Sequence, residues 1–130
     1  RSLALKENTL KHLRSALAEV VNSGSGTGGR AKSTLVEIAG KTGTAQVVEM
    51  RGAYVKSEQL SYLIRDHAWF VAYAPAGNPE IAVATLVEHG GHGGAAAAPL
   101  AKKVIEKYFS LQAQPADGRQ ASRQGERRAN

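Results

Sequence analysis

The chain contains no cysteine, which excludes disulfide bonds and thiol chemistry but does not separate a cytoplasmic from an extracytoplasmic protein. No apolar run approaches the roughly 18 residues that a transmembrane helix needs, and no signal peptide is recognisable. At 130 residues the chain is one domain or a piece of one. Because it opens on Arg1 rather than Met, we expect a fragment of a longer protein.

Aromatic residues and surplus charge are also scarce. Two Phe, one Trp and four Tyr offer few platforms for stacking on bases. The formal net charge of +6 comes from 17 basic and 11 acidic residues, and part of it lies in arginines near the C-terminal end. The remaining charge is too scattered for a nucleic-acid surface, so we expect no nucleic-acid partner.

Hydrophobic spacing predicts two helices and three strands. Residues 3–22 and 95–109 each carry an apolar face at helical spacing. Residues 33–48, 67–74 and 80–88 read as strands. Residues 49–66 form a long connection, either a flank of a functional site or a mobile loop, with a short helical turn around 57–63.

This order predicts an α+β fold, in which an antiparallel sheet of three strands carries flanking helices. The last two strands form a hairpin, and apolar residues on both faces of strand 80–88 predict burial on both sides. Trp69 and Phe70 are expected in the core. Residues 1–110 would form the domain, and residues 111–130 a disordered basic tail rich in Gln, Arg, Ser, Gly and Ala.

The stretch from Gly40 to Gln46 has an unusual composition. It follows the apolar residues Leu35, Val36 and Ile38, and it places a lysine, two threonines and two glycines on a predicted strand. Glycine inside a strand often marks the close approach of a ligand or another backbone. A cation and two hydroxyls beside such a glycine indicate an edge that recognises an anion.

Two glycine-rich patterns do not indicate nucleotide sites. Gly24, Gly26 and Gly29 match G-x-G-x-x-G, but a helix precedes them and a strand follows, which is the reverse of a dinucleotide site. The G-K-T at 40–42 is not a phosphate loop, because Leu35 stands where that motif requires glycine. Both patterns are better explained without a nucleotide.

Metal ligands and a catalytic pair are also disfavoured. Glu88, His89 and His92 lie among glycines in a predicted tight turn, without the further fixed ligand that zinc sites need. Asp66 and His67 are neighbours, so along a strand their side chains point to opposite faces. We expect no metal and no cofactor.

The residues around the K-T-G motif at Lys41, Thr42 and Gly43 make it stronger evidence than three residues alone. It is one of the short motifs of penicillin-recognising serine acyltransferases. Here it extends through Gln46 and precedes a hairpin built from R-D-H-A-W-F-V-A-Y-A-P at 65–75 and from residues 81–91. Together these residues closely resemble the C-terminal part of the transpeptidase domain of class B penicillin-binding proteins, in particular the elongation-type penicillin-binding protein 2. The resemblance implies the penicillin-binding protein and serine β-lactamase-like fold.

The resemblance also implies roles for the site residues. Lys41 would supply positive charge at the wall of the site and act with Thr44 as a catalytic group, the Thr44 N–H being one donor of an oxyanion hole. Thr42, Gly43, Thr44 and Gln46 would bind the substrate: the hydroxyls take the carboxylate of the donor peptide or of a β-lactam, and Gly43 leaves room for the substrate backbone.

The other motifs of that family are missing. No serine is followed by lysine at the third position, so S-x-x-K does not occur, and no asparagine has a serine two residues before it, so S-x-N does not occur. Without a serine nucleophile there is no acyl-enzyme, and the fragment alone is predicted to be inactive.

The parent protein is therefore expected to be a serine-type peptidoglycan D,D-transpeptidase. The alternatives are a serine β-lactamase-like fragment and a non-catalytic module that binds peptides or glycans at the same strand edge. The resemblance implies peptidoglycan stem peptides, β-lactams and the remainder of the transpeptidase domain as partners. It places the domain in the periplasm, with the membrane reached only through an N-terminal anchor outside this chain. An unpaired edge on strand 80–88 would also allow self-association.

Overall fold

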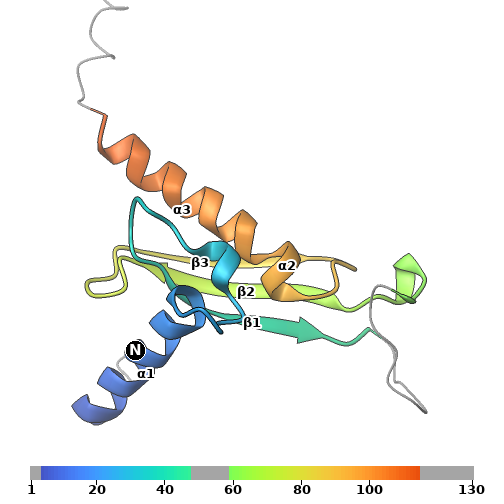
Figure 1. Ribbon diagram of the computed structural model, residues 1–130, viewed down its shortest axis with the longest axis horizontal. Coiled ribbons are helices and arrows are strands. Elements are labelled where there is room, and N and C mark those ends of the chain that lie inside the picture. The colour runs from blue at the N-terminus through green and yellow to red at the C-terminus, as the bar shows by residue number, and fades with distance from the viewer. Residues whose placement is uncertain (1–3, 48–58, 115–130) are drawn as a thin grey trace, which may run out of the picture.

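The structure is a computed structural model that describes residues 4–47 and 59–114. A three-stranded antiparallel sheet has the order β1-β2-β3, with β1 at Ala39–Ala45, β2 at His67–Ala74 and β3 at Ile81–Val87. Helices α1 (Glu7–Asn22), α2 (Gly93–Ala96) and α3 (Ala98–Gln112) surround it, with short 3₁₀ turns η1 (Gly29–Ala31) and η3 (Tyr62–Ile64). The predicted α+β arrangement of an antiparallel sheet with flanking helices is confirmed (Figure 1).

The two faces of the sheet differ in burial. Along β2, Ala68, Phe70, Ala72 and Ala74 are buried and alternate with the exposed Trp69 and Val71, as the two-residue period of a strand requires. Helices α2 and α3 cover the buried face (Figure 1). The expectation of a core position is therefore right for Phe70 and wrong for Trp69, which lies 38% exposed on the opposite face.

The core is made of small side chains around a few large ones. Phe70, Ile38, Ile105 and Val21 are the largest side chains that are fully buried, and most of the others in the cluster are alanines. Ile105 comes from α3 and Val21 from the last turns of α1, so the core joins both helices to the sheet. Leu13, in contrast, is 49% exposed, because only the C-terminal half of α1 packs on β1.

Strand β1 is much shorter than the predicted strand 33–48. Its ladder with β2 starts at the pair Ala39–Tyr73 and ends at the pair Ala45–His67. Strand β2 ends at Ala74, before Pro75, so it offers no further partner to residues 33–38 beyond one bond from the Ala76 N–H to the Glu37 carbonyl. The alternating apolar pattern of the sequence extends beyond β1 at its N-terminal end, but the paired residues of β2 do not extend as far.

Strand β3 is not buried on both sides, contrary to the prediction. Its residues alternate between half-buried and exposed, and Leu86 is 44% exposed. Within the described residues the sheet has no fourth strand, and Leu86 lies on the face away from α2 and α3. Strand β3 does pair with β2 in the antiparallel hairpin that was predicted.

Both helices differ from their predicted bounds. Helix α1 begins at Glu7, because Lys6 is still extended. The predicted helix 95–109 is two helices, α2 and α3, and α3 continues to Gln112 with Pro99 in its first turn. Leu100 and Val104 fit the helical spacing of the predicted apolar face but are 43% and 52% exposed, since Ala98, Ala101 and Ile105 face the sheet instead.

Two predictions fall mainly on residues that are not described. The long connection lies outside the described residues over 48–58, and the predicted tail lies outside them from 115 onward. The division into residues 1–110 and 111–130 stays a prediction. Within 4–47 and 59–114, no helix has the length and apolar character needed to cross a membrane.

Candidate functional site

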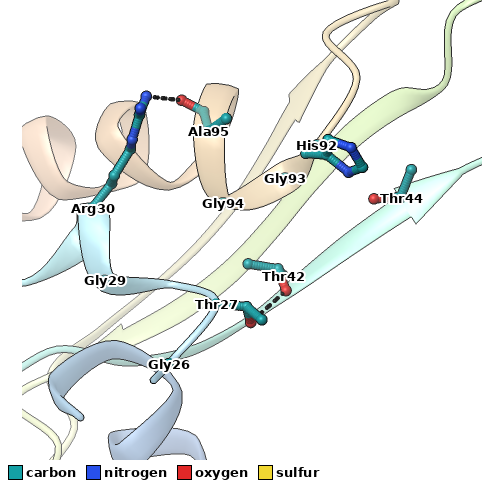
Figure 2. A pocket seen from close by; sticks show the side chains of 10 residues that line it. All are labelled: Gly26, Thr27, Gly29, Arg30, Thr42, Thr44, His92, Gly93, Gly94 and Ala95. Carbon is teal, nitrogen blue, oxygen red and sulfur yellow. Dashed lines mark hydrogen bonds between the residues drawn. The ribbon is translucent and has the colours of Figure 1, made fainter. Parts of the chain in front are cut away.

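A hollow of about 540 Å³ opens beside β1, where the Gly24–Gly29 loop and the start of α2 meet the strand. Figure 2 shows Thr42 and Thr44 on β1, Thr27 and Arg30 on one side, and His92 at the entry to α2. The complete lining consists of these five residues with Gly26, Gly29, Gly93, Gly94 and Ala95. Three segments far apart in the sequence therefore form one site.

The direction of the two threonines follows from the ladder. Residues directly opposite in an antiparallel pair project from the same face. Thr42 lies opposite Phe70 and Thr44 lies opposite Ala68, so both hydroxyls project from the face that α2 and α3 cover. Thr42 is half-buried and Thr44 is exposed. The hydroxyl of Thr42 is held by that of Thr27, with 3.0 Å between the oxygens (Figure 2).

Lys41 starts from the opposite face of the sheet, because it pairs with Val71. Its ammonium nevertheless bends round the strand edge, donates to the Thr42 carbonyl oxygen at 3.0 Å and lies 3.5 Å from the Thr42 hydroxyl oxygen. The side chain is exposed. The cation thus reaches the threonines along the edge of the strand rather than from inside the hollow.

Glycines let α2 lie directly on the strand. A Cβ at Gly93 would collide with the Trp69 carbonyl oxygen and stand 2.5 Å from the Gly43 carbonyl oxygen. Next to it, a Cβ at Gly94 would collide with the Thr27 carbonyl oxygen. Only residues without a side chain fit here, so the start of α2 forms the floor of the hollow.

The hollow is suited to an anion. None of its ten lining residues is a carboxylate, whereas Arg30 contributes a guanidinium and Lys41 an ammonium at its margin. The Arg30 guanidinium is anchored by a 3.2 Å hydrogen bond to the Ala95 carbonyl oxygen. Hydroxyls and N–H donors beside fixed positive charge are the groups that bind carboxylates.

The predicted site residues lie at different places around the hollow. Thr42 and Thr44 line it, Gly43 lies under Gly93, and Lys41 reaches its margin. Gln46 is exposed beyond the end of β1 and does not line the hollow.

Sequence reasoning missed Thr27, Arg30, His92 and the glycines of α2. Thr27 belongs to a glycine-rich loop that had no assigned role, and His92 was considered only as a metal ligand. No local pattern marks these residues, because it is the packing of the loop and α2 on β1 that brings them to the site.

Within the two described ranges, no group of three or more His, Asp or Glu side chains could hold a metal ion. The backbone N–H of His89 donates to Nδ1 of His67 at 2.9 Å, and Nδ1 of His89 donates to the Arg65 carbonyl oxygen at 3.2 Å. These bonds join the end of β3 to the start of β2.

The fold and this strand edge agree with a transpeptidase domain of the penicillin-binding protein type. Residues 1–106 match the family model of the penicillin binding protein transpeptidase domain, and the chain belongs to that family. The resemblance to the penicillin-binding protein 2 type is confirmed by the relatives that follow.

Several curated relatives are peptidoglycan D,D-transpeptidases named MrdA. The chain is 42% identical to the protein from Haemophilus influenzae over 93 residues, which is 70% of this chain. It is 46% identical to that from Acinetobacter baumannii over 98 residues, or 75% of this chain. The matches cover 14% of each relative, so the chain corresponds to a small part of their length.

Solved structures show the same likeness. Helicobacter pylori PBP2, in a complex with MreC, superposes with a TM-score of 0.68 at 33% identity, covering 82% of this chain and 19% of that one. Pseudomonas aeruginosa PBP2, in a complex with WCK 5153, has a TM-score of 0.65 at 36% identity, covering 83% of this chain and 21% of that one.

Proposed function

We propose that this chain forms the carboxylate-binding wall of a peptidoglycan D,D-transpeptidase. The observation that carries the proposal is the pair of hydroxyls of Thr42 and Thr44. They project from one edge strand into a hollow whose lining holds no carboxylate. These hydroxyls would bind the terminal carboxylate of a stem peptide, or the equivalent group of a β-lactam, with Lys41 as the nearby cation.

The backbone of β1 would bind the substrate as well. In an antiparallel ladder, the N–H and C=O of one residue point to the same side, and the next residue points to the other. The Thr42 carbonyl oxygen accepts from Lys41 at the strand edge, which supports an outward direction for Gly40, Thr42 and Thr44. An extended peptide would add to this edge past Gly43, and the Thr44 N–H would serve as an oxyanion donor.

The nucleophile would come from elsewhere in the parent protein. This chain has neither S-x-x-K nor S-x-N, so alone it would not form an acyl-enzyme. In the parent, a serine would attack the D-Ala-D-Ala donor, release D-Ala and pass the acyl group to an acceptor amine. The parent would be anchored in the cytoplasmic membrane, with this domain on the periplasmic side.

The fragment would also associate with itself in isolation. Strand β3 is at the edge of the sheet and has seven residues without a charged side chain. In the parent, the remainder of the transpeptidase domain would cover this edge. A second copy of the chain would be the available partner when the fragment is alone.

Fluorescent penicillin tests the proposal. We expect covalent labelling of the parent protein and none of the 130-residue chain. In the parent, Thr42→Val should lower the acylation rate about 10- to 100-fold, the value of a hydrogen bond to a charged group. Thr34→Val is the matched control, because Thr34 is an exposed threonine that does not line the hollow.

Three results would count against the proposal. Labelling of the isolated chain would show that a nucleophile is present after all. A parent that is never labelled would favour the non-catalytic peptide- or glycan-binding module. A parent that hydrolyses its acyl-enzyme rapidly would favour the β-lactamase alternative, which the transpeptidase names of the relatives do not support.

A further inference from the structure

The glycine-rich loop before β1 contacts the site through one side chain. Its residues Gly24, Gly26 and Gly29 match a nucleotide motif in the wrong structural context, which leaves the loop without a role. In the structure, Thr27 of this loop contacts Thr42, and the two hydroxyl oxygens are 3.0 Å apart (Figure 2). No other residue of the loop places a side-chain polar group on β1 in any hydrogen bond between described residues.

The backbone around Thr27 is held on several sides. A Cβ at Gly26 would collide with the Val20 carbonyl oxygen and stand 2.7 Å from that of Glu19. At Gly28, the N–H donates to the Val20 carbonyl oxygen at 2.9 Å, and the Phe70 ring leaves 3.1 Å for a Cβ. Gly94 of α2 closes over the Thr27 carbonyl oxygen. The loop is therefore fixed against α1, β2 and α2, and the direction of the Thr27 side chain is fixed with it.

Counting donors and acceptors shows what this contact does. A hydroxyl has one proton to donate and two lone pairs to accept with. The Lys41 ammonium can only donate, and it lies 3.5 Å from the Thr42 oxygen. When Thr27 also donates to that oxygen, both lone pairs of Thr42 are occupied, and its single proton is left to point into the hollow.

The opposite arrangement would be unsuitable for an anion. If Thr42 donated to Thr27, it would present a lone pair to the hollow and repel a carboxylate, which can only accept. A carboxylate that binds at the Thr42 hydroxyl therefore selects the arrangement in which Thr27 is the donor.

We propose that Thr27 is a positioning residue for the carboxylate site, and that its hydroxyl orients the Thr42 proton toward the substrate carboxylate. This inference rests on the proposed function, because it assumes that Thr42 binds that group. It makes Thr27 a determinant of specificity for acyl donors that carry a free carboxylate. Thr27 acts only through Thr42 and does not touch the reacting atoms.

The test compares benzylpenicillin with its methyl ester, which has no carboxylate. Acylation rates of the full parent protein are measured by competition with fluorescent penicillin. Thr27→Val should lower the rate for the acid about tenfold and leave the rate for the ester within about twofold, as expected for one lost charge-assisted hydrogen bond. Thr27→Ser, which keeps the hydroxyl, should restore the rate for the acid.

A double-mutant cycle tests whether Thr27 acts through Thr42. In a Thr42→Val background, Thr27→Val should cause no further loss, since the hydroxyl that it orients is gone. Thr27→Ala serves as a second variant without a hydroxyl, and thermal unfolding of each variant reports whether the fold is kept.

The outcomes separate this inference from the proposed function. If the unmodified parent reacts equally with acid and ester, the carboxylate site itself is wrong and the inference falls with it. If the unmodified parent prefers the acid, but Thr27→Val and Thr27→Ala leave that preference unchanged or slow both compounds equally, only the role of Thr27 is overturned. A further loss in the Thr42→Val background would also overturn it.

Discussion

Gly93 is a position where one methyl group would disturb both the fold and the site. Its Cα faces the carbonyl oxygens of Trp69 on β2 and Gly43 on β1. These backbone atoms cannot rotate away as the end of a side chain can. The contact between α2 and the sheet, and with it the floor of the hollow, therefore depends on the absence of a side chain.

Gly93→Ala should destabilise the chain by roughly 1–3 kcal/mol, the usual cost of overpacking. Gly77→Ala is the matched control, because a Cβ there has nothing within 4 Å. It should be neutral or slightly stabilising, since alanine lowers the entropy of the unfolded chain. Urea unfolding of both variants measures the difference, and equal midpoints would contradict the close approach of α2.

At the scale of elements, α3 is attached to the sheet by a narrow row of residues. Ile105 is fully buried in the core, whereas its neighbour Val104 is 52% exposed. Ser33 adds a 2.7 Å hydrogen bond from its hydroxyl to the Glu106 carboxylate, which ties the segment before β1 to the same helix. The burial of α3 thus differs sharply between adjacent positions.

Ile105→Ala should lower the free energy of unfolding by about 2–4 kcal/mol through lost burial and the cavity left behind. Val104→Ala on the same helix should change it by less than about 0.5 kcal/mol, because alanine is also the better helix former. Denaturant unfolding monitored by circular dichroism compares the two. Similar losses for both variants would mean that α3 packs with a different face.

For the molecule as a whole, apolar surface is left uncovered. Trp69, Val71 and Leu86 share the face of the sheet away from α3, and each is at least 38% exposed. In addition, β3 is an edge strand of the sheet. In the part of the chain that the structure describes, the core has only four large buried side chains, which provides limited stability. A chain with these features is expected to gain stability by covering this surface.

The isolated chain should self-associate, with a sedimentation coefficient that rises with concentration. Ala84→Lys puts a charge among the exposed residues of β3 and should shift the chain toward the monomer. Leu111→Lys is the control, because Leu111 is also an exposed apolar residue, at 54%, but it lies near the end of α3 rather than on β3. A chain that stays monomeric at its highest soluble concentration, or slow hydrogen exchange along β3 in a dilute monomer, would contradict an open edge.

Much of the fold was predictable from local patterns. Strand β2 has the predicted bounds, and β3 differs from them by one residue at each end, because turn residues mark both ends of the hairpin. Strand β1 was predicted too long, since alternation shows that a segment can be a strand but not how far its partner reaches. The prediction that β3 is buried on both sides was wrong for a related reason, because burial depends on which other segments cover the strand.

The sequence by itself determined the family and the chemical groups of the site, because K-T-G and the hairpin after it are local patterns with a defined spacing. Only the tertiary structure decided how those groups are arranged. The ladder register placed Thr42 and Thr44 on one face and Lys41 on the other, and the packing of two glycine-rich segments brought Thr27 and α2 to the strand. Contacts between segments distant in the chain depend on which surfaces fit together, and no short run of residues carries that information.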